Sequence, residues 1–116
     1  MTMSSTQRQT LERKIVQHLI DTALAAGWTV PYVDDGGERV KCTTAQDAMD
    51  TVFSVDDSTL YFRKKGLGTH CAVIILGNGI DCVSDCSVGD EFEAEVMDVS
   101  NAFVEKLEQL DLQGLA

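Results

Sequence analysis

The sequence predicts a single α+β domain, residues 1–116, in which an antiparallel sheet of about five strands carries helices mainly on one face. Three observations predict it. Apolar residues recur every three or four positions near both ends of the chain, which is typical of amphipathic helices. Short apolar or alternating runs lie between them, bounded by turns rich in Asp, Asn and Gly, which is typical of strands. The resulting order, αββαβββα, packs most simply as helices on one face of an antiparallel sheet.

A helix that ends near Ala26 is expected first, with Ser5 or Thr6 as its N-cap, while residues 1–5 are expected to fray. Gly27 follows at the position where a left-handed residue would end the helix. The helix is expected to bury one apolar stripe, which consists of Leu11, Ile15, Leu19 and Ala23 and is widened by Val16, Ile20 and Leu24.

Two strands are expected after this helix. Residues 28–33 and 38–42 have the composition of strands, and the Asp-Asp-Gly-Gly sequence at 34–37 is typical of the turn between them. Pro31 has no N–H to donate to a neighbouring strand. The first strand is therefore expected at an edge of the sheet.

A short helix and one more strand are expected next. Thr43 or Thr44 is predicted to cap a helix that covers residues 45–53. Residues 55–58 are expected to form a turn, and residues 60–64 a strand.

Residues 70–76 and 80–86 form the clearest predicted hairpin. Asn78-Gly79 between them is the preferred pair for a two-residue type I′ turn. A three-residue loop with a bulge would instead turn the side chains of one strand to the other face. In the two-residue register, three pairs oppose one another on one face: Ile75 with Cys82, Val73 with Ser84, and Cys71 with Cys86.

The last helix is expected to begin near Asp90, which forms the acidic version of a capping box with Glu93. Its apolar stripe consists of Phe92, Val96, Val99, Phe103, Leu107 and Leu110. Five carboxylates lie largely off this stripe and are the candidate partner-binding residues: Glu91, Glu95, Asp98, Glu105 and Glu108. Along ~20 Å of helix they could imitate a run of phosphates.

The charge of the chain is concentrated in its C-terminal part. The net charge is −10, from 9 Lys and Arg against 19 Asp and Glu, and the segment from Asp81 to Asp111 holds ten of the acidic residues and one base. Such a surface attracts basic protein surfaces and repels nucleic acid. We therefore expect a protein partner with a basic surface and no direct binding of nucleic acid. The alternative is that the acidic face only keeps the protein soluble.

The run Arg63-Lys64-Lys65 is a cluster of basic residues. The glycines that follow it do not have the spacing of a phosphate-binding loop. The cluster is interpreted as a charged strand end that prevents edge-to-edge pairing. As an alternative, it could meet the acidic helix of a second copy and give a homodimer.

Four cysteines are too few for a disulfide-rich secreted scaffold, and no C-x-x-C pair occurs. Cys82 and Cys86 would lie about 13 Å apart along a strand, too far to share one metal ion. Buried thiols are expected, with a metal site and a Cys71–Cys86 disulfide as open alternatives. The two histidines stand in no catalytic motif, so the sequence predicts no enzyme, no catalytic residue and no cofactor.

The sequence contains no segment that is typical of a membrane protein. The longest apolar run, residues 71–76, is far shorter than a membrane span. Residues 1–9 are polar and lack the apolar core of a signal peptide. We therefore expect no membrane association and a cytoplasmic location.

The stretch LGNGIDCVSD, residues 76–85, resembles a GN-x-G-x-D-V-I-S-D-Y pattern of small prophage-type bacterial proteins of unknown function. Residues 19–28 and 54–60 are similar to parts of the same proteins. This chain departs from the pattern because its turn is one residue shorter and Cys86 stands where an aromatic residue is typical. The resemblance implies a mobile element in a bacterial cell as the context, and it implies no catalytic or binding residues.

These observations predict a small, acidic, non-enzymatic accessory protein of a phage or mobile element that acts by protein–protein contact. Blocking a basic nucleic-acid-binding surface of a host factor would suit its charge, because long-range attraction speeds such an encounter. The alternative is a small-molecule or metal-binding module that uses the cysteine face of the 70–86 hairpin.

Overall fold

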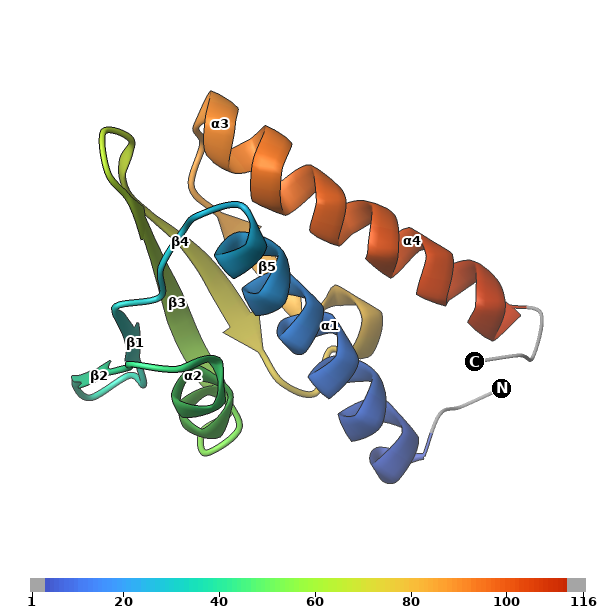
Figure 1. Ribbon diagram of the computed structural model, residues 1–116. Helices are drawn as coiled ribbons and strands as arrows, with labels where there is room; N and C mark the ends of the chain where they lie inside the picture. Colours follow the sequence, from blue (N-terminus) through green and yellow to red (C-terminus); the bar gives the residue numbers. More distant parts are fainter. Residues whose placement is uncertain (1–3, 113–116) are drawn as a thin grey trace.

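The computed structural model describes residues 4–112. Helices lie at both ends of the chain with five strands between them, so the predicted α+β class is confirmed (Figure 1). In chain order the elements are α1 (Ser5–Ala25), β1 (Tyr32–Asp34), β2 (Arg39–Lys41), α2 (Ala45–Val52), β3 (Asp57–Lys64), β4 (Gly68–Ile75), the 3₁₀ turn η1 (Gly79–Asp81), β5 (Val83–Cys86), α3 (Asp90–Phe92), the π-helical turn η2 (Glu93–Met97) and α4 (Asp98–Leu112).

The strands form one antiparallel sheet in the order β2-β1-β3-β4-β5. β3 and β4 pair over their whole length, from Asp57 opposite Ile75 to Lys64 opposite Gly68. The helices share one hydrophobic cluster with one face of this sheet, so the domain has two layers (Figure 1). Within residues 4–112, no helix combines the length and the apolar character needed to cross a membrane.

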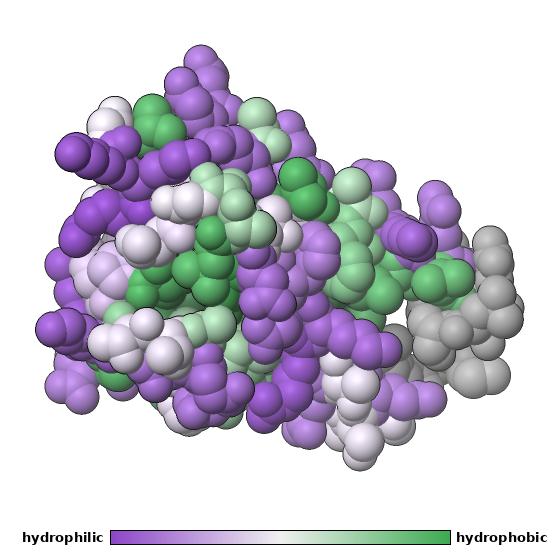
Figure 2. Space-filling model, viewed as in Figure 1, coloured by the Kyte–Doolittle hydropathy of each residue, from purple (hydrophilic) through white to green (hydrophobic). Residues whose placement is uncertain are grey.

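The core lies between the helices and the sheet. Leu60, Phe62 and Ile74 alternate along β3 and β4 with the half-buried Tyr61 and Val73, so the face toward the helices is the buried one. The largest helical contribution comes from α1, with Leu11, Ile15, Val16, Leu19, Ile20 and Ala23. This confirms the predicted stripe of the first helix apart from Leu24, which is 41% exposed. Figure 2 shows apolar residues gathered in a hollow of the visible face, within a mostly hydrophilic surface.

The first helix begins earlier than predicted. Ser4 is its N-cap: the Ser4 hydroxyl accepts a hydrogen bond from the N–H of Gln7, and the Gln7 side chain accepts one from the N–H of Ser4. The expectation that Ser4 and Ser5 fray is therefore wrong, and residues 1–3 lie outside the described residues. At the other end, Gly27 has a φ of +90°, as the predicted left-handed cap requires.

The edge position predicted for the first strand is wrong. β1 begins only at Tyr32 and lies between β2 and β3, which makes β2 the edge strand. Pro31 stands just before β1, where its missing N–H removes no hydrogen bond from the sheet. Its carbonyl accepts a hydrogen bond from the N–H of Cys42 at 3.0 Å. β3 begins at Asp57 and buries Ser58, so it includes part of the segment predicted as a turn.

Of the two threonines predicted to cap α2, Thr44 is the N-cap. Its hydroxyl accepts a hydrogen bond from the N–H of Asp47 at 3.1 Å. The Asp47 carboxylate accepts in return from the N–H of Thr44 at 3.3 Å and of Thr43 at 3.0 Å. The hydrogen bonds that Thr43 donates to this carboxylate are the main reason why the pKa of Asp47 lies below its ordinary value.

The connection between β4 and β5 is not the predicted type I′ turn. Asn78 has a φ of −86°, whereas a type I′ turn needs a positive value, and the residues that follow form η1. A bulge then shifts the register between Val73 and Ile74. The Cys71–Cys86 and Val73–Ser84 pairs are therefore wrong. The pairs in the structure are Ala72–Cys86, Val73–Asp85 and Ile74–Val83.

The loop has this shape because α1 holds it. The carboxylate of Glu12, which is 2% exposed, accepts hydrogen bonds from the N–H groups of Gly77 at 2.7 Å and Gly79 at 2.9 Å. Because a buried carboxylate needs such donors, the loop opens toward Glu12 instead of closing as a two-residue turn. A residue 65 positions before the loop thus decides the conformation of the hairpin.

The C-terminal helix, residues 90–112, runs through α3, η2 and α4 (Figure 1). Its N-cap is Gly89, and the predicted capping box of Asp90 and Glu93 is not formed. The wider turn of η2 shifts the positions that face the core. Ser100 is consequently buried at 1% exposure, whereas Val99, predicted on the buried stripe, is 44% exposed.

Candidate functional site: the acidic face of the C-terminal helix

Four of the five predicted carboxylates lie on the solvent side of the C-terminal helix. They are exposed, and we call them the acidic face: Glu91, Asp98, Glu105 and Glu108. Three apolar side chains, Ala94, Val99 and Ala102, are exposed on the same helix. The acidic face therefore presents charge together with a small apolar area.

The fifth predicted carboxylate, Glu95, has another role. Its two oxygens lie 2.9 and 3.0 Å from Nζ of Lys64 on β3, and both side chains are about 70% buried, with 30% and 28% of their surfaces exposed. The same Nζ donates to the carbonyl oxygen of Ala26 at 2.7 Å and lies 5.7 Å from the ring of Trp28. Glu95 thus joins the C-terminal helix to β3 and to the end of α1.

The pairing of Lys64 also changes the interpretation of the basic cluster. Lys64 is engaged within its own chain. Arg63 and Lys65 are exposed, and Nε of Arg63 donates to the hydroxyl of Thr69 at 3.3 Å. Two of the three cations of the cluster therefore remain on the surface, where a second copy or another acidic molecule could reach them.

The acidic face has little positive charge near it in the sequence. Residues 90–111 contain eight Asp and Glu and one base, Lys106. The surface can therefore attract a basic partner over a distance of about one Debye length, ~8 Å at physiological salt.

The cysteines do not form the predicted common face. Because Ala72 rather than Cys71 opposes Cys86, the Cys71 and Cys86 side chains lie on opposite faces of the sheet. Cys82 is fully buried, and Cys42 is 6% exposed. In residues 4–112 all four thiols are free, and no group of three or more His, Cys, Asp or Glu side chains has the arrangement of a metal site.

Burial also reduces the reactivity of three thiols. It raises the pKa of Cys82 to about 12, with a smaller contribution from the charge of Glu12. Burial is likewise the main cause that raises the pKa of Cys42 and of Cys86. Since the thiolate is the nucleophile and the metal ligand, these three side chains are poorly suited to either role.

Both histidines are engaged in packing. The ring of His18 stacks on Phe103 with centroids 3.9 Å apart and an interplanar angle of 2°, which joins α1 to α4. The ring of His70 stacks on Phe92 at 4.9 Å and meets the edge of Trp28 at 5.6 Å. Neither arrangement brings an imidazole next to a thiol nucleophile.

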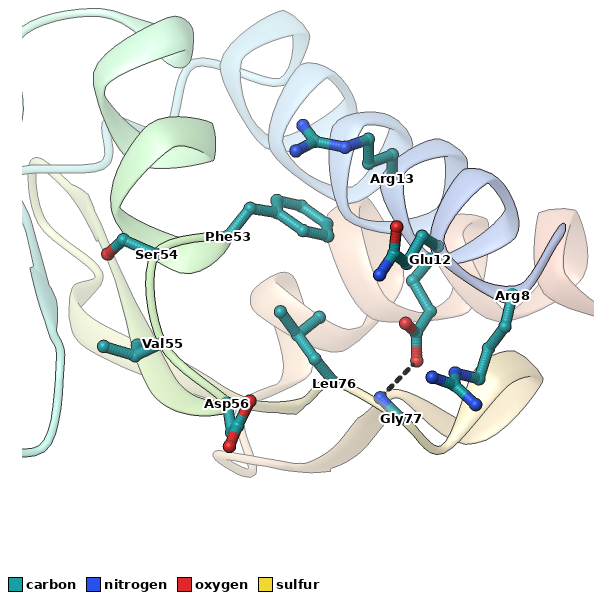
Figure 3. A pocket seen from close by; sticks show the side chains of 10 residues that line it. Arg8, Glu12, Arg13, Phe53, Ser54, Val55, Asp56, Leu76 and Gly77 are labelled. Atoms are coloured by element: carbon teal, nitrogen blue, oxygen red, sulfur yellow. Dashed lines mark hydrogen bonds between the residues drawn. The ribbon is translucent and has the colours of Figure 1, made fainter. Parts of the chain in front are cut away.

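One open cleft, which sequence reasoning missed, lies beside the N-terminal half of α1 (Figure 3). It has a volume of about 410 Å³, and its lining comes from three places in the chain: residues 8–13 of α1, residues 53–56 after α2, and residues 76–77 after β4. The spacing of Arg8, Glu12 and Arg13 on one side of a helix was the available signal. It could not be interpreted without knowing which loops meet that side.

Comparisons of the chain with family models, with curated proteins and with solved structures found no match.

Proposed function

We propose that this protein is a small non-enzymatic accessory protein that binds the basic surface of a protein partner through the acidic face of its C-terminal helix. The observation that carries the proposal is the outward position of Glu91, Asp98, Glu105 and Glu108 on a helix whose other side is packed in the core. A helix held in this way presents its charges in a constant spacing, so little ordering is needed on binding.

The partner is expected to be a protein that normally contacts nucleic acid, because such proteins carry surfaces rich in Lys and Arg. Carboxylates on the acidic face would take the place of phosphates and block that surface. The resemblance to prophage-type proteins supports a role in a phage or another mobile element, where blocking a host factor is useful. The protein would act in the cytoplasm.

The test compares two variants with the same change in net charge. In the first, the acidic face is neutralised by Glu91→Gln, Asp98→Asn, Glu105→Gln and Glu108→Gln. In the second, four exposed carboxylates outside the C-terminal helix are neutralised by Asp21→Asn, Glu38→Gln, Asp50→Asn and Asp57→Asn. Each protein, and the unchanged chain, is immobilised and exposed to a bacterial lysate at low and at high salt.

The proposal predicts that the unchanged chain and the second variant retain the same basic protein at low salt and release it at high salt, whereas the first variant does not retain it. The retained protein should also lose its nucleic acid when the unchanged chain is added. Equal losses in both variants would show that net charge, not the acidic face, is responsible. Retention of no basic protein would contradict the proposal.

The alternative of a metal or ligand site on the cysteine face has lost its geometric basis, because Cys71 and Cys86 do not share a face. We therefore do not propose it as a second function.

A further inference from the structure

A cleft lies outside the acidic face of the C-terminal helix. The cleft beside α1 lies where the helix, the α2–β3 connection and the β4–β5 loop meet (Figure 3). Its volume of about 410 Å³ falls in the lower part of the range for pockets that bind small molecules. None of its lining residues belongs to the C-terminal helix, so the cleft does not depend on the proposed function.

The cleft contains two guanidinium groups in a protein of net charge −10. Among the side chains that the structure describes, residues 4–110, neither Arg8 nor Arg13 has a carboxylate within ion-pair distance. Nε of Arg8 is shielded from solvent and has no acceptor among the described residues. Arg8 lines the cleft, and an anion bound there would accept charge-assisted hydrogen bonds from its guanidinium group.

Glu12 lies between the two arginines on the helix and also lines the cleft. Its Oε2 accepts hydrogen bonds from the N–H groups of Gly77 and Gly79, and Figure 3 draws the bond to Gly77. Glu12 therefore holds the loop that forms one wall of the cleft. Asp56 is exposed at the opposite wall.

The rest of the lining combines apolar side chains with the polar residues Gln9 and Ser54. The guanidinium carbon of Arg13 lies 4.4 Å from the centroid of the Phe53 ring, which holds the cation flat against that ring. Leu76 and Val55 line the same cleft, and Figure 3 shows Phe53 and Leu76 turned toward its interior. A ligand that fits this lining combines an anionic group with a planar apolar part.

We propose that the cleft binds a small organic anion, with its carboxylate or phosphate group on Arg8 and its apolar part against Phe53 and Leu76. Arg13 adds positive potential from the side of the ring. Carboxylate and phosphate share the property that guanidinium recognises, namely oxygen atoms that accept charge-assisted hydrogen bonds. The two classes of anion are separated by experiment.

The test uses phenyl phosphate and benzoate as probes, with inorganic phosphate as the anion without a ring and benzyl alcohol as the ring without a charge. Each is titrated into ¹⁵N-labelled protein, and amide shifts are followed in two-dimensional NMR spectra. The proposal predicts saturable shifts for the amides of Gly77 and Phe53 with phenyl phosphate or benzoate, and weaker or no shifts with the other two compounds. Comparison of the two active probes identifies the preferred anionic group.

Arg8→Gln should weaken binding about tenfold or more, since it removes a charge-assisted bond. Lys14→Gln is the matched control, because Lys14 is an exposed cation of the same helix that does not line the cleft; it should leave the affinity unchanged. If Arg8→Gln fails to fold, Arg13→Gln replaces it, with a smaller loss expected. The absence of cleft shifts at about 10 mM probe, or equal affinities in the cleft variant and Lys14→Gln, would overturn the proposal.

Discussion

The ammonium group of Lys64 lies 2.9 Å from Oε2 of Glu95, and this pair connects the last residue of β3 to the π-helical turn of the C-terminal helix. Lys64 also donates to the carbonyl oxygen of Ala26 at the end of α1. Three segments that are distant in sequence therefore meet at one cation. The pair explains why Glu95, unlike the neighbouring carboxylates, belongs to the fold rather than to the acidic face.

Replacing Lys64 should destabilise the protein more than replacing its neighbour. Lys64→Met removes the ion pair and the hydrogen bond to Ala26, and we expect a loss of about 1 kcal/mol in the free energy of unfolding. Lys65→Met, at an exposed position, should cost about 0.3 kcal/mol or less. Urea denaturation measures both. A double-mutant cycle of Lys64→Met with Glu95→Gln should give a coupling energy of about 0.5 kcal/mol, and additive losses would contradict a direct interaction.

Glu12 should be essential for the β4–β5 loop. Glu12→Ala leaves the N–H groups of Gly77 and Gly79 without their acceptor and should cost about 2–4 kcal/mol. Glu12→Gln keeps one carbonyl oxygen as an acceptor, so it should cost less than half as much. Urea denaturation gives the free energies, and hydrogen exchange should show faster exchange at both glycines in the alanine variant. Equal stability of all three proteins would refute the proposed role of Glu12.

Gly89 is required for steric reasons. A Cβ at this position would overlap Cε1 of the half-buried His70 ring, although the φ of 178° is accessible to any residue. Gly89→Ala should therefore cost about 1–3 kcal/mol by overpacking. Gly37→Ala is the matched control, because a Cβ there meets its nearest neighbour, the side chain of Asp35, at an ordinary 3.6 Å.

If the His70 ring is what excludes a methyl group at position 89, the stability costs of Gly89→Ala and of a substitution at His70 should not be additive. His70→Ala creates space for the new methyl group, so the cost of Gly89→Ala should largely disappear in that background. Thermal unfolding of the four proteins measures this coupling. An undiminished cost in the His70→Ala background would show that the backbone, rather than the imidazole, excludes alanine.

Cys82 should be protected from alkylation and should make the stability depend on alkaline pH. Burial raises the pKa of its thiol to about 12, whereas the thiol of an unfolded chain ionises near 8.5. The contribution of this group to stability is fully present below the unfolded pKa and is lost as the pH rises toward the folded pKa. The difference in unfolding free energy between the unchanged chain and Cys82→Ala should therefore shrink between about pH 9 and pH 12.

Mass spectrometry provides a second readout for the same thiol. With iodoacetamide at pH 8, the partly exposed Cys71 should be labelled first and Cys82 only when urea unfolds the protein. Early labelling of Cys82 in the folded protein would contradict its burial.

Sequence patterns were sufficient wherever a local rule decides the structure. The period of Leu11, Ile15 and Leu19 predicted the buried side of α1, and Gly27 predicted where the helix ends. The acidic face followed from the spacing of its carboxylates along the C-terminal helix. Each of these features depends on residues within a few positions of one another.

Local rules were insufficient where a distant residue competes for the same backbone or side chain. Asn78-Gly79 prefers a type I′ turn, yet the buried carboxylate of Glu12 binds the loop amides and prevents it. Val99 fits a regular helical stripe, but the π-helical turn before it rotates it outward and brings Ser100 into the core. The spacing of Glu95 along the helix predicts an exposed side chain, but in the folded chain Lys64 of β3 lies beside it and forms an ion pair with it.

The sequence by itself determined the fold class, the position of the helices and the negative charge of the C-terminal helix, because these follow from composition and from the periods of the helix and the strand. Only the tertiary structure decided which carboxylates of the C-terminal helix are exposed, that Cys71 and Cys86 lie on opposite faces of the sheet, and that a cleft lined by two arginines exists. The physical reason is that hydrogen bonds, ion pairs and cavities join residues that the chain separates by tens of positions, and no local pattern encodes those distances.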